Sequence, residues 1–343
     1  MTIEYGIVIP SYEPDEKLVE LVKQLDWLPL DHVIVVDDGS VRPGTPEVFE
    51  ACEAVGVTVI HHEKNAGKGS AIKTGSRHLL QMGCNGVVTC DCDGQHAPDD
   101  VQKVAHAMKD NPGWLIMGSR DTAEMPPRSV AGNKMTRTLL RLLYGLNLRD
   151  AMTGLRGIPL EHADELLALD GKQGEHDMQM LVNSNRLFDG ILEVPIKTIY
   201  FDNNAGSHFN PLTEGVIIYG VIFRSLPKFI LSSVGCSLFD LLIYGLIFHV
   251  VGIMAFEAAI IARVIAGTAN FLINKYVVFK GGSKDYNAIR YIILALFILA
   301  TSSSLVYLFV DTLGFWAVPT KIVIDCILFL FSYGVQNKIA NRK

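Results

Sequence analysis

The sequence lacks three features that would assign it to common classes of protein. It has no excess of basic residues, since its formal net charge is −6, whereas a nucleic-acid-binding protein normally carries a basic patch. Its six cysteines have no spacing typical of a disulfide framework, which fits a reduced, cytosolic environment. Residues 1–10 contain neither a basic segment nor a long apolar core, so we expect no signal or transit peptide there.

Two common phosphate-binding motifs are also absent. The segment Gly67-Lys68-Gly69-Ser70 lacks the spacing of a P-loop, and the residues after it lack the third glycine of a dinucleotide-binding fingerprint. The segment still predicts a tight turn that opens a helix. The helix N-terminus and Lys68 face a nucleotide in one interpretation and form a plain structural turn in the other.

Long apolar runs are missing from the first part of the chain and abundant in the last. Apolar residues make up 49% of the sequence, and beyond Leu226 they form runs of membrane-spanning length. Residues 214–224 resemble an interfacial helix. We therefore predict a globular cytosolic domain over 1–210, an amphipathic linker helix over 211–228 and a transmembrane domain over 229–343.

The globular part alternates between short apolar runs and segments with helical spacing. The runs predict strands over 5–9, 32–36, 57–61, 86–90 and 114–118, and the segments between them predict helices over 15–25, 45–55, 68–82 and 99–111. This alternation predicts an α/β fold with a mostly parallel sheet. Ligands bind at the carboxyl ends of such strands. One crevice is therefore expected to collect the polar residues that follow the strands: Glu13, Asp37, Asp38, Asp91, Asp93 and Arg120.

Four motifs occur in a characteristic order: Ile9-Pro10-Ser11-Tyr12-Glu13, Val36-Asp37-Asp38-Gly39-Ser40, Asn65-Ala66-Gly67-Lys68-Gly69 and Asp91-Cys92-Asp93-Gly94-Gln95-His96. In these motifs the sequence resembles family 2 glycosyltransferases of the polyprenyl-phosphate sugar synthase, or dolichyl-phosphate mannose synthase, type. Three later blocks are similar to the same family: Gly118-Ser119-Arg120, Arg128 with Gly132-Asn133-Lys134, and Thr153-Gly154-Leu155-Arg156. The resemblance covers about the first two hundred residues and implies a GT-A type nucleotide-sugar-binding domain.

The acids after the first two predicted strands are candidates for binding a nucleotide. A uracil or guanine base and its ribose offer N–H and O–H donors, which carboxylates accept. The resemblance implies that Glu13 and Asp37 do so. The alternative for Asp37-Asp38-Gly39-Ser40 is a turn followed by a helix N-cap. The resemblance adds further residues to the nucleotide site: Pro10, Tyr12, Asp38, Lys68 and Asp91.

The pair Asp91 and Asp93 predicts a divalent cation site. Two carboxylates one residue apart can share a hard cation that bridges the phosphates of a nucleotide, and Mg²⁺ or Mn²⁺ are the ions that prefer oxygen ligands. By resemblance Gln95 joins this metal shell and Asp93 is catalytic, and Cys92 is then expected to face away. A rival interpretation makes Cys90, Cys92 and His96 a zinc site, but no second ligand cluster follows.

Phosphate groups and the acceptor have several further candidates. Arg120 and Arg128 offer paired donors for phosphate oxygens or, alternatively, surface ion pairs. Glu175 and Asp177 lie where inverting family members carry acids near the acceptor, so they are candidate catalytic residues or only helix-start carboxylates. An acceptor phosphate monoester has a second pKa of about 6, is largely ionised at neutral pH and gains little from a general base.

The end of the globular domain departs from the family pattern. Mannosyl- and glucosyl-phosphate synthases often carry an Arg and a Lys there to hold the lipid phosphate, whereas residues 200–209 of this chain contain Asn and His in their place. Neutral donors on Asn203, Ser207 and His208 can still bind a phosphate, and we predict that they do.

Four apolar segments, residues 229–251, 255–276, 291–310 and 316–337, predict transmembrane helices. Lys and Arg flank only the ends that face the chain termini and the central connection, so the positive-inside rule predicts that both termini and the catalytic domain are cytoplasmic. The segment resembles the GtrA-like four-helix domain and looks like two repeated hairpins. The second helix ends in Asn274-Lys275 and the fourth in Asn337-Lys338.

Four charged residues lie inside the predicted spans, where charge is costly: Asp240, Arg263, Lys321 and Asp325. Mutual pairing, as between Lys321 and Asp325 at i, i+4, is one interpretation. The other is a transport role, in which the membrane domain moves a lipid-linked sugar across the bilayer. Four helices are few for a transporter, so this role would require a homo-oligomer through the membrane domain.

Taken together, these features predict a multi-pass protein of the plasma membrane. Its expected reaction transfers a sugar from a nucleotide sugar, with UDP-glucose as the predicted donor, to a polyprenyl phosphate such as undecaprenyl phosphate, with inversion at the anomeric carbon. A GDP-mannose-dependent enzyme and a transferase that acts on a lipid hydroxyl are the enzymatic alternatives. The second of these would need a true general base.

Overall fold

The computed structural model describes residues 4–172, 174–199, 211–252, 254–279 and 286–341. The chain forms two compact units, one of residues 1–141 and 146–222 and the other of residues 142–145 and 223–343. The seven strands of the first unit are β1 (Tyr5–Ser11), β2 (Val33–Asp37), β3 (Thr58–His61), β4 (Gly86–Thr89), β5 (Trp114–Ser119), β6 (Arg156–Pro159) and β7 (Gly190–Pro195). Its α-helices are α1 (Glu16–Lys23), α2 (Thr45–Val55), α3 (Lys68–Gln81), α4 (Pro98–Asp110), α5 (Pro127–Tyr144), α6 (Ala163–Leu167), α7 (Gly174–Val182), α8 (Ser184–Leu187) and α9 (Pro211–Ile222).

The strands form one sheet in the order β3-β2-β1-β4-β6-β5-β7. All pairings are parallel except those of β6, which runs antiparallel to β4 and β5. The prediction of an α/β fold with a mostly parallel sheet is therefore confirmed. The five predicted strands and four predicted helices of residues 5–118 are all present, and their ends agree within two residues. The strands β6 and β7 were not predicted.

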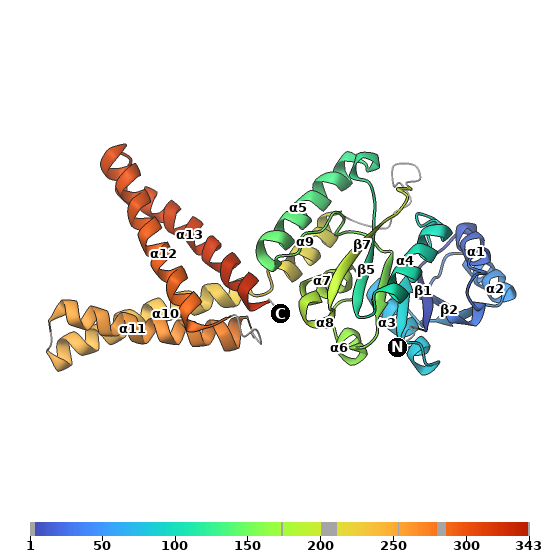
Figure 1. The fold of residues 1–343 in the computed structure, drawn as a ribbon, viewed down its shortest axis with the longest axis horizontal. Helices are drawn as coiled ribbons and strands as arrows, with labels where there is room; N and C mark the ends of the chain where they lie inside the picture. Colours follow the sequence, from blue (N-terminus) through green and yellow to red (C-terminus); the bar gives the residue numbers. More distant parts are fainter. Residues whose placement is uncertain (1–3, 173, 200–210, 253, 280–285, 342–343) are drawn as a thin grey trace. The chain divides into compact units, whose positions relative to one another are not determined.

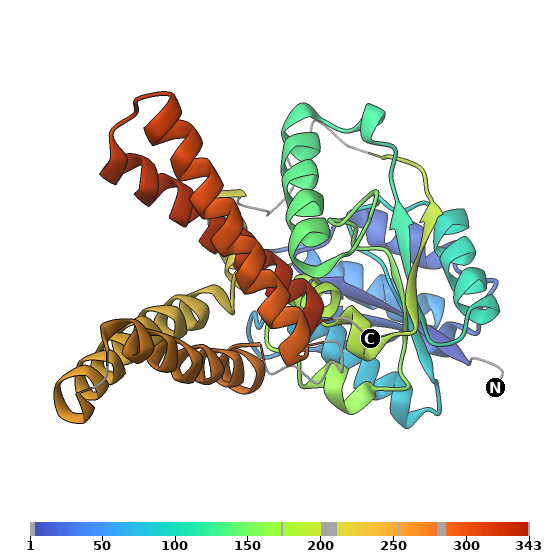
Figure 2. The same ribbon diagram turned by 60° about the vertical axis from the view of Figure 1, so that its left-hand side comes forward.

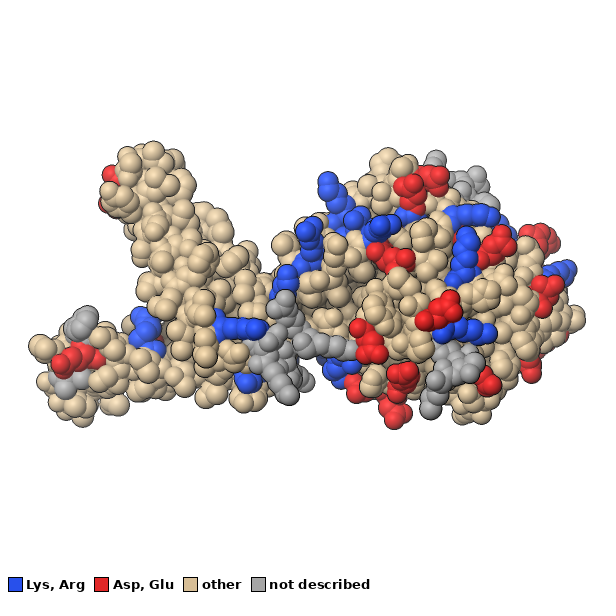
Figure 3. Space-filling view, viewed as in Figure 1, with Lys and Arg blue, Asp and Glu red and all other residues tan. Residues whose placement is uncertain are grey.

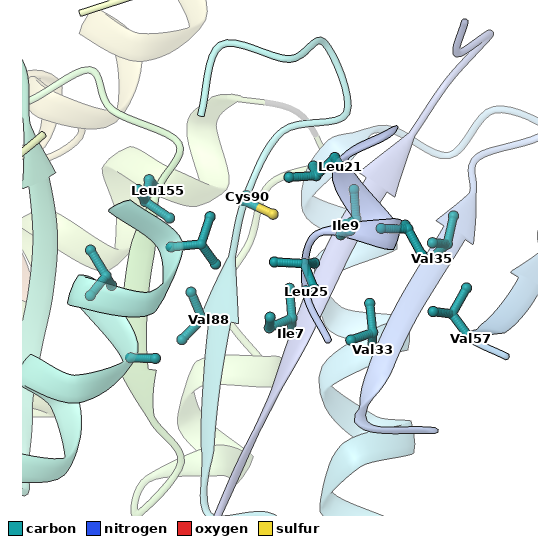
Figure 4. Packing of buried hydrophobic residues seen from close by; sticks show 14 of the residues in the cluster. Ile7, Ile9, Leu21, Leu25, Val33, Val35, Val57, Val88, Cys90 and Leu155 are labelled. Carbon is teal, nitrogen blue, oxygen red and sulfur yellow. The ribbon is translucent and has the colours of Figure 1, made fainter. Parts of the chain in front are cut away.

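One face of the sheet is covered by α1, α2 and α4 (Figure 1). Because β1, β2 and β4 are buried on both sides, they are continuous apolar runs. The side chains of Ile7, Val33 and Val88 pack against Leu21 and Leu25 of the α1 region in the main hydrophobic cluster (Figure 4). The three strands run parallel to one another, so their carboxyl ends lie at one edge of the sheet.

The opposite face carries α3, which packs closely on β1 and β2. Gly75 makes this close approach possible, because a Cβ atom there would lie 2.7 Å from Val8 Cγ1 and 3.3 Å from Val36 Cγ2. Helix α7 packs against both α3 and α9. The N-terminus of α3 and the first turn of α7 are therefore brought together above the sheet.

Among its described residues, the second unit contains four helices that are long and apolar enough to span a membrane: Leu226–Val251, Glu257–Val278, Ala288–Thr312 and Ala317–Ala340. Their α-helical cores are α10 (Leu226–Leu246), α11 (Ala255–Ile273), α12 (Ala288–Val306) and α13 (Ala317–Ala340), and the first three continue into π-helical turns. Within each hairpin, α10 lies beside α11 and α12 beside α13 (Figure 2). The predicted all-α domain with four membrane helices is confirmed.

Asn274 and Asn337, near the ends of the two hairpins, both accept hydrogen bonds from serines of α10 or its N-cap, so these bonds do not follow the predicted repeat, which stays a prediction. Ser232 of α10 donates to Asn274 Oδ1 at 2.9 Å, and Ser225 donates to Asn337 Oδ1 at 3.1 Å. Both asparagines are buried, and Asn274 also donates to Gln336 Oε1 at 3.2 Å. Apolar burial does not hold helices together in lipid, so such buried polar contacts connect the hairpins.

Helix α9 lies in the region of the predicted amphipathic linker helix. Its buried side includes Ile218, Val221 and Ile222, but Val216 and Ile217 are exposed. Apolar side chains therefore lie on both sides of the helix. Exposed apolar residues suit a membrane interface, and the interfacial position of residues 211–228 stays a prediction.

Candidate functional site

The loop after β1 holds Glu13 in an unusual backbone conformation. Glu13 has φ +50°, and it is the one non-glycine residue with positive φ in the described part of the chain. Its N–H donates to Ser40 Oγ at 2.8 Å, and Arg42 Nη2 donates to its carbonyl oxygen at 2.7 Å. A non-glycine residue in this region costs about 1–2 kcal/mol and persists only where its surroundings hold it, often at functional sites.

The predicted neighbours of Glu13 lie on the same strand end. Pro10 is buried within β1 and is paired with Val36 of β2, and the half-buried Tyr12 follows the end of β1. The structure thus brings Pro10, Tyr12 and Glu13 beside the end of β2. Their contact with a nucleotide stays a prediction.

Asp37 is the last residue of β2 and is almost buried. Its Oδ1 accepts the Ser40 N–H at 2.9 Å, and its Oδ2 lies 2.8 Å from His61 Nδ1 at the end of β3. The side chain of His61 is about half exposed, so it is accessible at the site edge. Sequence reasoning missed His61. The parallel register of β2 and β3, which pairs Asp37 with His61, is what brings the two together.

Asp38 holds a loop in place. It is 3% exposed, and its two carboxylate oxygens accept the N–H groups of Ala66 at 2.9 Å and Gly67 at 2.7 Å, while Oδ1 also lies 2.8 Å from His62 Nδ1. The geometry therefore gives Asp38 a positioning task, and its contact with a nucleotide stays a prediction. Beside these residues opens a groove of about 530 Å³, lined in part by His61, Lys73 and Arg77.

Asp91 lies two residues beyond β4 and contacts two donors. Lys68, the first residue of α3, donates to Oδ1, and His96 Nε2 lies 3.3 Å from Oδ2. Burial opposes ionisation of this carboxyl, but the Lys68 ammonium and His96 outweigh burial and hold the pKa of Asp91 well below its usual range. Asp91 is therefore an anion at every physiological pH. The structure thus places Lys68 and Asp91 in direct contact, and their binding of a nucleotide stays a prediction.

Asp93 and Gln95 supply the remaining oxygens of the predicted metal site. Asp93 lies at the surface with its carboxyl partly enclosed by neighbouring atoms, and its Oδ1 accepts the Gln95 N–H at 2.9 Å. Burial of the carboxyl and the nearby charge of Asp91 raise the pKa of Asp93. A cation between the two carboxylates would relieve this repulsion, so the donor set, two carboxylates and an amide, fits Mg²⁺ or Mn²⁺.

Cys92 points back toward the sheet, as expected for the residue between two metal ligands. It packs against the hydrophobic cluster, and its thiol lies within reach of Ser11 and the Tyr12 backbone. Among the described residues, no group of three or more His, Cys, Asp or Glu side chains is placed to hold a metal ion. That finding contradicts the alternative zinc site of Cys90, Cys92 and His96.

Asp177, in the first turn of α7, faces the same charged residues. Its Oδ2 lies 4.0 Å from Lys68 Nζ, and its Oδ1 lies 3.7 Å from Arg156 Nη1. Arg156 is 1% exposed and also donates to the Asp177 carbonyl oxygen at 2.9 Å. The structure thus brings Asp177 to the site through Lys68. Arg156 lies in a recognised block, but only the fold reveals its role as the buried partner of Asp177.

Glu175 has a local partner. Its Oε1 accepts the Lys172 N–H at 2.9 Å, as a carboxylate near a helix N-terminus often does. Next to it, His176 is buried, and its Nδ1 atom has no hydrogen-bond partner among the residues that the structure describes. Burial lowers the pKa of His176 to about 4. Catalytic roles for Glu175 and Asp177 stay predictions.

Arg120 and Arg128 are in different environments. Arg120 forms a two-pronged pair with the fully buried Asp150, at 2.7 Å from Nε and 3.2 Å from Nη2. Asn133 also donates to Asp150 at 3.1 Å. Arg120 is therefore held in a structural network, whereas Arg128 is exposed in the first turn of α5. Phosphate binding by either arginine stays a prediction, and the predicted phosphate ligands Asn203, Ser207 and His208 lie outside the described residues.

The charged side chains inside the membrane helices are paired. Arg263 Nη2 on α11 lies 3.1 Å from Asp240 Oδ2 on α10. Lys321 Nζ lies 2.8 Å from Asp325 Oδ1, and it also donates to Ser302 Oγ of α12 at 2.8 Å. The Arg263–Asp240 pair thus connects the two helices of the first hairpin, whereas Lys321 and Asp325 both lie on α13 and reach α12 through Ser302. Both observations support the interpretation of mutual pairing.

Comparisons with known proteins agree with this arrangement. The family described as Glycosyl transferase family 2 matches residues 6–167. An undecaprenyl-phosphate mannosyltransferase of Micrococcus luteus is 30% identical over 202 residues, which cover 55% of this chain and 81% of the relative. The chain belongs to glycosyltransferase family 2. The family described as GtrA/DPMS, transmembrane domain matches residues 228–340, so this family 2 glycosyltransferase is a membrane protein.

Other relatives of this family 2 glycosyltransferase have related names. A UDP-N-acetylglucosamine–dolichyl-phosphate N-acetylglucosaminyltransferase of Methanococcus voltae is 29% identical over 65% of this chain and 96% of the relative. A polyprenol monophosphomannose synthase of Mycolicibacterium smegmatis is 29% identical over 55% and 75%, respectively. Among solved structures, glucosyl-3-phosphoglycerate synthase of Mycobacterium tuberculosis with Mn²⁺ and UDP has a TM-score of 0.49 and 20% identity, covering 66% of this chain and 80% of that one. A likeness at that level establishes neither a substrate nor an ion for this chain.

Proposed function

We propose that this chain transfers a sugar from a nucleoside diphosphate to a polyprenyl phosphate at the cytosolic face of the plasma membrane. The observation that carries the proposal is the union of two parts in one chain. A site with Asp91, Asp93 and Lys68 at the carboxyl end of a parallel sheet suits a nucleotide diphosphate. The same chain carries four membrane helices. Such an anchor suits an acceptor that is itself a membrane lipid.

The acceptor class has better support than the sugar. The three relatives named above all have a polyprenyl or dolichyl phosphate, or polyprenol, in their names, but one transfers N-acetylglucosamine and two concern mannose. None of these three names contains glucose. We keep UDP-glucose as the donor predicted from the sequence, and UDP-N-acetylglucosamine and GDP-mannose are its competitors.

The reaction requires one bond to form and one to break. A phosphate oxygen of the lipid attacks the anomeric carbon, and the bond from that carbon to the nucleoside diphosphate breaks with inversion. Glu13 and Asp37 accept hydrogen bonds from the base and ribose. Because a phosphate monoester is already ionised, Asp177 need not remove a proton. Its ion pairs suit it instead to position Lys68 and the first turn of α7.

A divalent cation completes the proposed site. Asp91, Asp93 and Gln95 would hold Mg²⁺ or Mn²⁺, which when bound neutralises the charge that develops on the departing diphosphate. The supporting observation is the chemistry of the donors, which are oxygens alone, together with the raised pKa of Asp93 beside Asp91. Removal of any one of these three side chains is expected to weaken the binding of both the cation and the diphosphate.

The helix α5 supports a site close to a lipid surface. It carries Arg128, Lys134, Arg137 and Arg141 and no acidic residue, and Lys and Arg side chains gather over it (Figure 3). Three of the four are exposed, as are the apolar side chains of Met135 and Leu142. Basic and apolar side chains on one helix favour an anionic leaflet, and cytoplasmic leaflets are anionic.

The test is sugar transfer by the purified full-length protein in nanodiscs. Undecaprenyl phosphate is incubated with radiolabelled UDP-glucose, UDP-N-acetylglucosamine or GDP-mannose, with Mn²⁺ or with excess chelator. We expect one donor to yield a labelled lipid, no product in chelator, and an activity loss of at least about 100-fold for Asp93→Asn. Asp110→Asn, an exposed acid at the end of α4, is the matched control. No labelled lipid from any donor, or full turnover in chelator, would contradict the proposal.

A further inference from the structure

Lys68 lies between two carboxylates of the site. Its ammonium donates to Asp91 Oδ1 and lies 4.0 Å from Asp177 Oδ2. The side chains of Lys68 and Asp91 are 32% and 30% exposed, so solvent reaches the pair. Lys68 is therefore the shared counter-ion of two carboxylates.

The backbone of Gly154 packs closely against the pair. A Cβ atom at this position would lie 2.3 Å from Asp91 Oδ2 and 2.8 Å from Lys68 Nζ. Thr89 Oγ1 donates to the Gly154 carbonyl oxygen at 2.9 Å and fixes this backbone to the end of β4. The contact between Lys68 and Asp91 is therefore built into the fold and is not a chance surface encounter.

Both oxygens of Asp91 are thus used, one by Lys68 and the other by His96 at 3.3 Å. A divalent cation bound by Asp91 would have to share this carboxylate with the ammonium, and two cations at such short range repel each other. Asp93 differs, because it is exposed and contacts neither group in any hydrogen bond of the described residues. The two proposed metal ligands are therefore not equally available.

We propose that Lys68 is the resident counter-ion of Asp91 and couples metal binding to nucleotide binding. When a divalent cation binds, the Lys68 ammonium leaves Asp91. The ammonium then pairs with the diphosphate of the nucleotide sugar. This inference rests on the proposed function and adds to it a mutual dependence of the two ligands, because neither the cation alone nor the nucleotide alone meets a fully prepared site.

The surroundings of Lys68 explain why the diphosphate is needed. When the ammonium leaves Asp91, the nearest other carboxylate is that of Asp177, which already lies 3.7 Å from the buried Arg156 guanidinium. Moving the ammonium from Asp91 to Asp177 therefore gains little electrostatic energy. A diphosphate offers several unpaired anionic oxygens, so its presence favours the displaced position of Lys68. By linkage, the nucleotide raises the affinity for the cation by the same factor as the cation raises the affinity for the nucleotide.

The experiment measures Mn²⁺ binding to the full-length protein by electron paramagnetic resonance, with and without saturating UDP or GDP. In the native protein we expect the nucleotide to tighten Mn²⁺ binding at least about tenfold, within the usual range of coupling between two sites. Lys68→Met should bind Mn²⁺ alone about fivefold or more tightly, because the competing cation is gone, and most of the nucleotide effect should disappear. A purely structural lysine would have the opposite effect on the affinity for Mn²⁺ alone.

Two further variants keep the result interpretable. Lys68→Gln is a second neutral replacement, for use if the methionine variant does not fold, and Lys23→Met removes an exposed lysine of α1 as the control. Unchanged or weaker Mn²⁺ binding by both neutral variants, with native melting temperatures, would overturn the inference while leaving the proposed function intact. Absence of Mn²⁺ binding that depends on Asp93, with or without nucleotide, would overturn both.

Discussion

The buried His176 predicts a specific loss of stability at acidic pH. Its side chain is enclosed where α3 and the loop before α7 meet, since a Cβ atom on Gly69 would lie 2.7 Å from His176 Cβ. Burial lowers its pKa to about 4, partly opposed by the charge of Asp177, whereas an unfolded histidine has a pKa of about 6.5. The folded state therefore strongly favours the neutral ring.

The sign of the effect follows from proton binding. Between pH 6.5 and about 4 the unfolded chain binds a proton at His176 that the folded protein does not, so the free energy of unfolding falls as the pH falls. The slope is about 1.4 kcal/mol per pH unit, and the whole interval amounts to about 3 kcal/mol as an upper bound. The contribution of the neutral His176 ring to the free energy of unfolding is complete above pH 6.5 and is lost as the pH falls toward 4.

The assay is denaturant unfolding at several pH values, followed by tryptophan fluorescence. Trp27 and Trp114 lie in the globular unit and Trp316 lies in the membrane unit, so a Trp316→Phe background restricts the signal to the globular unit. In that background His176→Leu, which has a side chain of similar volume, should reduce the pH slope by up to one proton. Equal slopes for the two proteins between pH 6.5 and 4.5 would refute the reasoning, because other acids titrate identically in both.

Three further predictions concern other parts of the molecule. Gly154→Ala should keep the native melting temperature but lose Mn²⁺ binding and sugar transfer, because its Cβ would displace Asp91 and Lys68. Gly132→Ala, which has open space around it, should change neither Mn²⁺ binding nor transfer. Normal transfer by Gly154→Ala would contradict the proposed site. A reporter fused after Lys343 should be active only on the cytoplasmic side, as the basic loops predict, and activity outside would refute that topology. Arg263→Leu should lower the melting temperature because it leaves Asp240 unpaired in lipid, and the further change Asp240→Leu should restore it; no difference between the single and the double variant would show that the pair contributes nothing.

The sequence predicted best what depends on local pattern. The strands β1 to β5 and the helices between them follow from apolar runs and helical spacing, and the membrane spans follow from length and hydropathy. The juxtaposition of Asp37 and Asp91 near the same sheet edge also followed, because parallel strands end at one edge. Each of these features follows from a rule that applies to residues close together in the sequence or to the direction of neighbouring strands.

Features that depend on distant residues were not predictable in this way. The antiparallel direction of β6 depends on the path of residues 120–155, which return the chain to the opposite end of the sheet, and no periodicity in β6 itself encodes it. Likewise, the pairing of Arg156 with Asp177 and of His61 with Asp37 requires tertiary register. Asp38 was assigned to the nucleotide from its motif, but its partners Ala66 and Gly67 are 28 and 29 residues away.

The left-handed conformation of Glu13 has a consequence for attempts to stabilise this protein. Glycine adopts φ +50° at no steric cost, so a library screened only for heat resistance should enrich Glu13→Gly. Such clones would survive heating better and, under the proposed function, bind the nucleotide less well. Heat resistance and donor affinity therefore make opposite demands at this position, and a stabilisation campaign should leave residue 13 fixed and choose its substitutions elsewhere.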